Sequence, residues 1–384
     1  MYRRYLMPFS MRADFSIRIL PYIKPCTSAP TKNREKHGER PEMNGDPALQ
    51  ALLDLELVSE RHKYDNDAVR MILERRPRAA SALYQFRAFG GRHVYPLLVA
   101  IALGASADVV ELLWDAYPPA DDPGEGHPLG GWTPLIIALH YDASIDVVQL
   151  LLRRFPVALQ RRDALGGLPL HYACSRATTE VVRLLAESCP EAMRKKDFRG
   201  MTPLHHACTS RASLDVVRLL VNKCPEALQD GDERGRIPLH HACHHGAPLL
   251  VVRFLLESRV RTVEEKDWNG LTPLVLLEQR VGGVCSNTLV SIRIALALVH
   301  LNPNRNGCEA NALKVLEEFT KLRWWRGSTL LLDECPSIMH SLCLKDEALP
   351  YLLSKLSREC KLETMFRTLR GLAGVFLHQD PTSS

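Results

Sequence analysis

The chain of 384 residues carries a phrase that returns every 34 or 35 residues, and this period constrains its fold more than any other feature. The phrase is clearest as Met201-Thr-Pro-Leu-His-His-Ala-Cys, with a weaker copy that begins at Pro96. A fixed period of this length is typical of repeat architectures, in which each unit buries its apolar face against its neighbours. We therefore expect one stack of about six or seven units, not the two or three separate domains that chain length alone suggests. The aligned prolines are Pro134, Pro169, Pro203, Pro238 and Pro273.

A second phrase, two valines followed by a variable residue and two leucines, recurs in step with the first. It is clearest as Val181-Val-Arg-Leu-Leu, and its apolar residues follow the spacing of an amphipathic helix. A proline follows it, as in Cys189-Pro190-Glu-Ala-Met, and proline ends a helix or starts a fresh short turn. The first phrase also predicts a helix, because a threonine can cap a helix whose first position is proline. The expected capping residues are Thr133, Thr202 and Thr272.

The cysteines mark the same period. The chain has 11 of them, an odd number with no Cys-x-x-Cys pair, so the sequence suggests neither a complete disulfide framework nor a zinc ribbon. Cys174, Cys208 and Cys243 lie 34 and 35 residues apart, and Cys189 and Cys224 lie 35 apart. We interpret them as small apolar residues of the core in a reducing, intracellular compartment.

The Thr-Pro-Leu-His-x-Ala phrase resembles the hallmark of the ankyrin repeat. The resemblance implies an all-α ankyrin-repeat solenoid, in which stacked helix-turn-helix units carry β-hairpin-like fingertip loops. It also implies that His171, His205 and His240 hydrogen-bond the neighbouring loop. Ala173 and its counterparts Ala207 and Ala242 should be small so that neighbouring helices can approach closely. An aspartate followed three residues later by glycine should form each fingertip turn, at Asp163, Asp197, Asp232 and Asp267.

The resemblance covers residues 47–300, with a regular core at 164–267. Within that core we expect units at 164–197, 198–232 and 233–267. Degenerate units should precede them at 91–127 and 129–162, and residues 268–300 should cap the array. The segment from Asp67 to Pro77 is similar to the second helix of one further N-terminal unit. Some positions depart from the family pattern: Leu168 and Ile237 replace the capping threonine, and Leu98, Ile136 and Val275 replace the histidine.

The two ends of the chain differ from the array. Residues 1–40 hold nine basic and three acidic residues, a net charge of +6, whereas the whole chain carries only +5. We expect residues 1–46 to be a basic, disordered arm. Residues 301–384 show apolar residues at helical spacing and should form a helical C-terminal region, either degenerate repeats or a cap.

The sequence offers a tempting but weak metal motif. His240, His241, His244 and His245 surround Cys243, and helical spacing would place three of the histidines on one face. The same residues, however, follow the period of the array, whereas a catalytic or metal site is a single asymmetric constellation. We therefore expect no metal, no cofactor and no enzymatic activity.

The tryptophans have two predicted roles. Trp324 and Trp325 could form an exposed binding hot spot, but covering the end of the stack is the favoured interpretation. Trp132 and Trp268 lie beside fingertip glycines and are predicted to be surface anchors.

Function in a repeat fold lies in what its concave face and fingertips bind. We expect a non-catalytic scaffold or adaptor that binds an unidentified partner protein, through a ladder of aromatic and cationic side chains suited to an acidic, partly apolar partner. The fingertip residues predicted to contact it are Ala164, Leu165, Phe198, Arg199, Glu233, Arg234, Trp268 and Asn269. The predicted contacts on the exposed face of the first helices are Tyr172, Arg176, His206, Ser210, His241 and His245.

Alternatives concern the basic arm. Residues 1–40 could bind phosphate in a nucleic-acid-associated regulator, or could form a mitochondrial transit peptide, although a solvated tail is preferred. No apolar run reaches the 18 residues or more that a membrane span needs. We expect a cytoplasmic monomer that binds protein and neither nucleic acid nor membrane.

Overall fold

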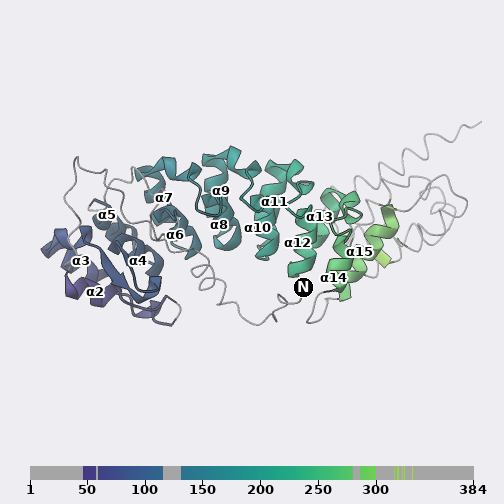
Figure 1. The fold of residues 1–384 in the computed structure, drawn as a ribbon. Helices are drawn as coiled ribbons and strands as arrows, with labels where there is room; N and C mark the ends of the chain where they lie inside the picture. The colour runs from purple at the N-terminus through teal and green to yellow at the C-terminus, as the bar shows by residue number, and fades with distance from the viewer. Residues whose placement is uncertain are drawn as a thin grey trace, which may run out of the picture. The chain divides into compact units, whose positions relative to one another are not determined.

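The computed structural model describes residues 46–57, 59–115, 131–279 and 286–299, together with 315, 318, 319, 322, 324 and 331. Helices dominate it, and the chain divides into two compact units, Met1–Ala227 and Leu228–Ser384 (Figure 1). The basic arm up to residue 45, with its two alternative roles, lies outside the described residues, as do Trp325 and most of the region 301–384.

The first unit begins with a repeat that has lost the recurring phrase. Its two helices are α2 and α3, and α3 lies where the sequence predicted a second helix. The loop after them closes as a true hairpin, in which Tyr84 pairs with Val94 and Phe86 with Arg92. The Tyr84 hydroxyl donates to the Ala79 carbonyl at 2.9 Å, which ties this hairpin to the preceding turn. The elements are α2 (Pro47–Leu53), η2 (Arg61–Lys63), α3 (Asn66–Arg75), η3 (Pro77–Ser81), β1 (Tyr84–Phe86), η4 (Arg87–Phe89) and β2 (Arg92–Val94).

The rest of the first unit alternates short first helices with longer second helices. Each first helix starts on the recurring proline, where the missing N–H leaves no hydrogen bond unmade. The second helices that begin at Ile145, Thr179 and Leu214 are capped by a serine or threonine, as where Ser213 Oγ accepts from Val216 N at 3.4 Å. The elements are α4 (Pro96–Leu103), α5 (Ala107–Asp115), α6 (Pro134–His140), α7 (Ile145–Arg154), η5 (Pro156–Gln160), α8 (Pro169–Arg176), α9 (Thr179–Ser188), η6 (Pro190–Arg194), α10 (Pro203–Thr209), α11 (Leu214–Lys223) and η7 (Pro225–Leu228), the last of which reaches into the second unit.

The second unit also alternates first and second helices, but its second helix α13 follows Pro248 and has no side-chain cap. Its first helices α12 and α14 pack against each other, and α13 packs against α15. The proline that follows α3, α7, α9 and α11 starts a 3₁₀ turn, whereas here Val260 takes that place. The elements are α12 (Pro238–His245), α13 (Leu249–Ser258), η8 (Val260–Val263), α14 (Pro273–Glu278) and α15 (Ser286–Val299).

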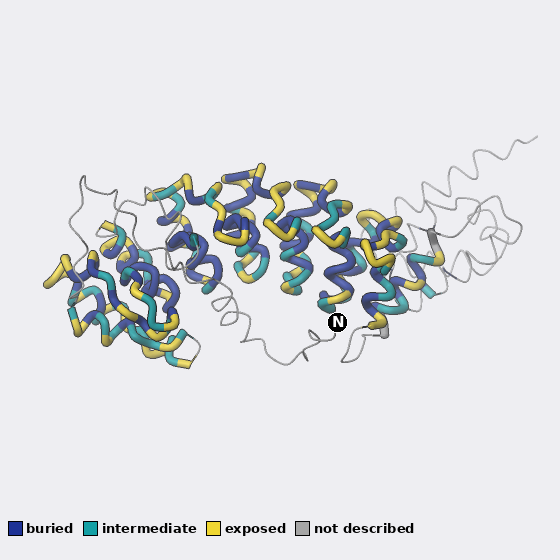
Figure 2. Tube along the Cα trace, in the orientation of Figure 1, coloured by how far each residue is buried: buried dark blue, intermediate teal, exposed yellow. Residues whose placement is uncertain are grey.

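The core lies between the helix layers of each unit, where the tube in Figure 2 is dark blue. Ala173 and Ala207 are fully buried on the neighbouring helices α8 and α10, and Ala242 is fully buried on α12. The five cysteines in the described residues are buried and form no disulfide, including the three that follow these alanines. Burial raises the pKa of the Cys208 thiol to about 12, so this side chain is a protonated, apolar part of the core.

One predicted cap differs. Thr133 and Thr272 accept a hydrogen bond from the backbone three residues on, at 3.2 and 3.5 Å. At α10 a side chain of the helix also takes part: the Thr202 hydroxyl lies 2.8 Å from Nδ1 of His205, and Thr202 N donates to the same nitrogen at 3.1 Å.

Candidate functional site

Four fingertip loops share one backbone design, and each runs from two residues before the turn aspartate to the turn glycine. In the loop at 195–200, Asp197 Oδ1 accepts from the N–H groups of Arg199 and Met201, both at 2.9 Å. Gly200 N donates to the Asp197 carbonyl at 3.0 Å with φ +72°, a left-handed conformation that favours glycine. The other three loops, at 161–166, 230–235 and 265–270, repeat these bonds and this conformation.

In three of the four loops, a side chain of the first helix of the same repeat holds the second carboxylate oxygen of the turn aspartate, whereas Asp267 Oδ2 accepts from Arg236 Nε at 3.0 Å. His206 Nε2 donates to Asp197 Oδ2 at 2.9 Å, and His241 Nε2 donates to Asp232 Oδ2 at the same distance. The Tyr172 hydroxyl does the same for Asp163. Three residues that were predicted only as partner contacts therefore also brace their loops. A sequence signal for this was present, because each brace follows its aspartate by nine residues.

The pKa of the turn aspartate differs with the chemistry of its brace. Burial raises the pKa of Asp163, and its bond to the neutral Tyr172 hydroxyl does not offset that cost. Burial works in the same direction at Asp232, but the hydrogen bond from His241 and two backbone N–H groups outweigh it and lower its pKa to about 2. A histidine brace thus holds an ionised carboxylate inside the loop.

The histidine of the recurring phrase reaches the next loop, as the resemblance implied. His171 Nδ1 accepts from Leu168 N at 3.1 Å, so the ring proton is on Nε2, which lies 3.1 Å from the carbonyl oxygens of Lys195 and Met201. His240 Nε2 contacts the Leu271 carbonyl in the same way, at 3.1 Å. Burial lowers the pKa of His171 to about 4, which keeps the ring neutral and in this tautomer.

An aromatic side chain caps one tip in each unit. Phe198 is 64% exposed and Trp268 is 77% exposed. Their backbone N–H groups donate to the preceding fingertip, Phe198 to Leu165 O at 3.0 Å and Trp268 to Arg234 O at 2.9 Å. Each ring also lies over the glycine of that fingertip, because a Cβ on Gly166 would come within 2.6 Å of Phe198. The rings are therefore positioned and exposed at once, as a binding anchor requires.

Comparison with known families decides what these loops belong to. A model of ankyrin repeats in three copies matches residues 144–230, and a model of a single ankyrin repeat matches residues 234–267. The chain is an ankyrin-repeat protein. The two matches cover the predicted regular core at 164–267 except residues 231–233, and the helical structure is the expected all-α ankyrin solenoid. A comparison with curated proteins finds no match.

Most predicted contact residues of this ankyrin-repeat protein lie at its surface. Tyr172, His206 and His245 are half-buried. His241 is buried, so the prediction that it lies on an exposed face was wrong: its bond to Asp232 draws the ring inward. The exposed members in the first unit are Ala164, Leu165, Arg176, Phe198, Arg199 and Ser210, and those in the second unit are Glu233, Arg234, Trp268 and Asn269.

The two predicted roles of the tryptophans have different outcomes. Trp132 is buried, with its ring centroid 4.8 Å from that of His140 and 5.6 Å from that of Tyr172, so the prediction of a surface anchor was wrong there. Trp324 is buried against the ring of Phe319 and donates to Glu257 Oε1 at 2.6 Å. It covers α13 of the ankyrin array, which supports the favoured interpretation of that residue.

The histidine cluster around Cys243 does not converge on a point. The rings of His241 and His245 lie parallel with centroids 5.9 Å apart, and His244 is exposed. Within the described part of the chain, no group of three or more histidine, cysteine or acidic residues is arranged to hold a metal ion. Nor is any helix described there both long and apolar enough to cross a bilayer.

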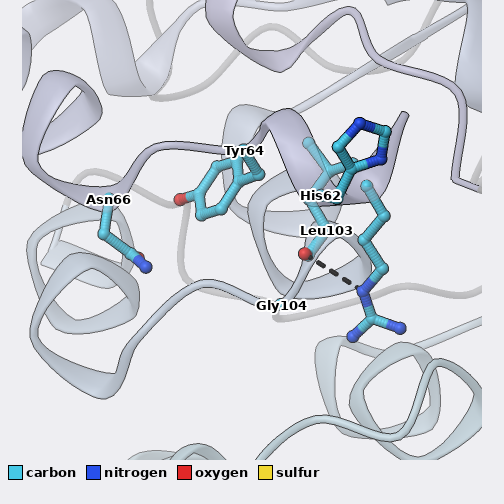
Figure 3. A pocket seen from close by; sticks show the side chains of 6 residues that line it. His62, Tyr64, Asn66, Leu103 and Gly104 are labelled. Atoms are coloured by element: carbon cyan, nitrogen blue, oxygen red, sulfur yellow. Dashed lines mark hydrogen bonds between the residues drawn. The ribbon is translucent and has the colours of Figure 1, made fainter.

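The first unit also has an open pocket of about 530 Å³ that no sequence signal indicated (Figure 3). It lies between η2 and the end of α4, where Arg61 Nε donates to the Leu103 carbonyl at 3.1 Å. The Tyr64 hydroxyl is enclosed there without a hydrogen-bond partner among the described residues, and burial raises its pKa. Asn66 Oδ1 is used by Ser106, at 2.8 Å from its N and 2.9 Å from its Oγ. The pocket has no acidic lining residue.

Proposed function

We propose that this ankyrin-repeat protein is a non-catalytic scaffold or adaptor that binds a partner protein through its fingertips and the adjoining first helices. Ankyrin repeats generally mediate protein–protein interaction. The observation that carries the proposal is the exposure of Phe198 and Trp268, two large aromatic side chains that fixed loops hold in solvent. Buried aromatic anchors supply much of the energy at protein interfaces, so these positions are where a partner would gain most.

The polar residues at the tips support a binding role over a catalytic one. The aspartate and its histidine brace recur at Asp197 and Asp232 with the same 2.9 Å bond. The other aspartate oxygen, Oδ1, accepts from the loop backbone, and the repetition follows the period of the fold. We accordingly propose that these groups keep loops in shape and take no part in proton transfer to a substrate.

We place the protein in the cytoplasm as a monomer that binds protein and neither nucleic acid nor membrane. The buried cysteines of the described residues form no disulfide, which supports a reducing compartment, since thiols at such spacing stay reduced there. The identity of the partner follows from experiment.

The experiment is affinity purification with the full chain as bait, followed by direct binding of the purified partner. We expect Phe198→Ala combined with Trp268→Ala to weaken partner binding by at least tenfold, about 1.4 kcal/mol, which is typical when interface anchors are truncated. The matched control is Val157→Ala with Leu250→Ala, which removes exposed apolar groups outside the fingertips. Equal binding by the two double variants, both folded by circular dichroism, would refute the fingertip model.

A further inference from the structure

The two fingertip loops of the first unit form a basic surface. In both loops, the two residues immediately before the turn aspartate are arginines or lysines. Arg199 adds a further cation just after Asp197. All of these side chains are exposed except that of Arg161, which is half-buried with its guanidinium 5.8 Å from the ring of Phe155. We name this surface the basic tip pair, and its cations are Arg161, Arg162, Lys195, Lys196 and Arg199.

The loops of the basic tip pair are fixed to each other. Phe198 N donates to the Leu165 carbonyl at 3.0 Å. Arg162 Nη1 bridges the two loops, at 2.6 Å from the Gly166 carbonyl of its own loop and 2.8 Å from the Lys196 carbonyl of the next. The cations are therefore presented on one preorganised surface, which lowers the entropic cost of binding.

The carboxylates of these loops are turned away from that surface. Asp163 is 5% exposed, and its oxygens accept from Leu165 N, Gly167 N and the Tyr172 hydroxyl. Asp197 accepts from two backbone N–H groups and from His206, and its side chain is 7% exposed. The two carboxylates are thus bound within the turns, and the charged side chains of these loops that reach solvent are cationic.

Apolar surface lies at the centre of the same loops. Phe198 is 64% exposed over Gly166, and Leu165 is 40% exposed beside it. A surface that only neutralised a nucleic-acid backbone would need a run of cations, and a typical duplex binder makes about 6 to 10 phosphate contacts. A small cationic rim around exposed apolar side chains matches a protein segment better.

We propose that the basic tip pair binds an acidic segment of a partner protein, with an apolar side chain of that segment seated against Phe198 and Leu165. The inference rests on the proposed function and adds the chemistry of the partner. It assigns recognition of acidic residues to the first unit, because the corresponding loops of the second unit bear Asp230, Glu233 and Glu265.

The test uses the full chain and a short fluorescein-labelled synthetic peptide in which glutamates flank a central leucine–tryptophan pair. Fluorescence anisotropy should show binding that weakens as salt is raised. The same peptide with glutamine in place of glutamate, and a version with alanine in place of the apolar pair, should each bind at least about tenfold more weakly. Equal binding of all three peptides would overturn the proposal.

Matched variants localise the binding. Lys195→Glu with Arg199→Glu reverses two charges whose side chains make no hydrogen bond or ion pair within the described part of the chain, and it should weaken peptide binding at least about tenfold. Arg259→Glu with Arg261→Glu makes the same charge change on exposed residues of the second unit outside its fingertip loops and should leave peptide binding within about twofold. Equal losses in both double variants would overturn the assignment to the first unit.

Two further outcomes separate this inference from the proposed function. If a DNA oligonucleotide displaces the peptide and binds more tightly, the basic tip pair is a nucleic-acid surface and the inference fails. If the peptide does not bind but capture of the purified partner still depends on Phe198 and Trp268, the inference fails while the proposed function stands. A partner that is captured independently of both aromatics removes the proposed function itself.

Discussion

The fingertip loops of the two units have the same backbone conformation but carry net surface charges of opposite sign. The glycines that close them have φ values of +75° and +72° in the first unit and +72° and +76° in the second. All four turn aspartates accept the same two backbone N–H groups. Yet the positions just before the aspartate are Arg161 and Arg162 in one loop and Asp230 and Gly231 in another. Shape in these loops is set by a few residues, and the others are free to define a partner.

The units also differ in how far the pKa of a buried histidine is lowered. His171 and His240 occupy equivalent places, and each lies between the backbone N–H that starts its helix and a carbonyl of the next loop. Burial lowers the pKa of both, but only that of His171 falls to about 4. The first unit holds a second such residue, His140, whose pKa burial also lowers to about 4. We therefore expect acid to destabilise the first unit more than the second.

The largest expected effect is on acid stability. The folded pKa of His171 is about 4, below its ordinary value of 6.5, so its contribution to stability is complete above pH 6.5 and is lost as the pH falls toward 4. The full loss is about 3 kcal/mol. Urea unfolding followed by tryptophan fluorescence, at about pH 7 and about pH 4.5, measures most of it.

Glutamine variants sharpen that comparison, because an amide can accept and donate hydrogen bonds but cannot be protonated. His171→Gln should reduce the dependence of the unfolding free energy on pH more than His240→Gln does. If the two variants flatten the pH profile equally, the units do not differ in acid sensitivity and this contrast is lost.

The recurring positions explain how much the sequence could predict. The prolines, the turn aspartates and the small Ala207 each serve the backbone or the packing between helices, so their chemistry is required in every repeat. From these residues the helices, the turns and the role of His171 could be predicted. The second half of the first repeat was predicted and the first half was not, because α2 keeps the proline and the alanine of the phrase, Pro47 and Ala51, but not its leucine and histidine. Its loop forms a hairpin closed by Tyr84 instead of the recurring turn.

The candidate site was harder to predict because exposure depends on pairs of residues. His206 and His241 occupy the same place in the phrase, but only His241 is buried, and Trp132 beside its glycine packs on His140 whereas Trp268 beside its own stays in solvent. A single position in a repeat does not report which neighbours will cover it. The nine-residue spacing from aspartate to brace is visible in the sequence, but its meaning comes from the 2.9 Å bonds.

A smaller effect tests whether the two cores are equivalent. Ala207 and Ala242 are both fully buried at the same place in their repeats. Replacing either with leucine should overpack the helices and lower the free energy of unfolding by about 1 to 3 kcal/mol. Chemical denaturation of the single variants measures both values, with Ala164→Leu on an exposed fingertip as the control that should change little. A loss of stability at one alanine and none at the other would show that the two cores are not equivalent.

The smallest effect separates the backbone from the ring that lies on it. Gly235 and Gly270 have nearly the same conformation, φ +72° and +76°, but a Cβ on Gly235 would come within 2.5 Å of the Trp268 ring, whereas one on Gly270 meets nothing within 4 Å. Either glycine replaced by alanine should cost about 1 kcal/mol for the left-handed backbone. Only Gly235→Ala should also displace Trp268, which a shift in its fluorescence emission and weaker partner binding would report. Because Trp268 is 77% exposed, the ring can move aside at little cost in stability, so the two variants should unfold alike and bind differently. Equal binding by both variants would show that partner binding does not depend on the position of the Trp268 ring.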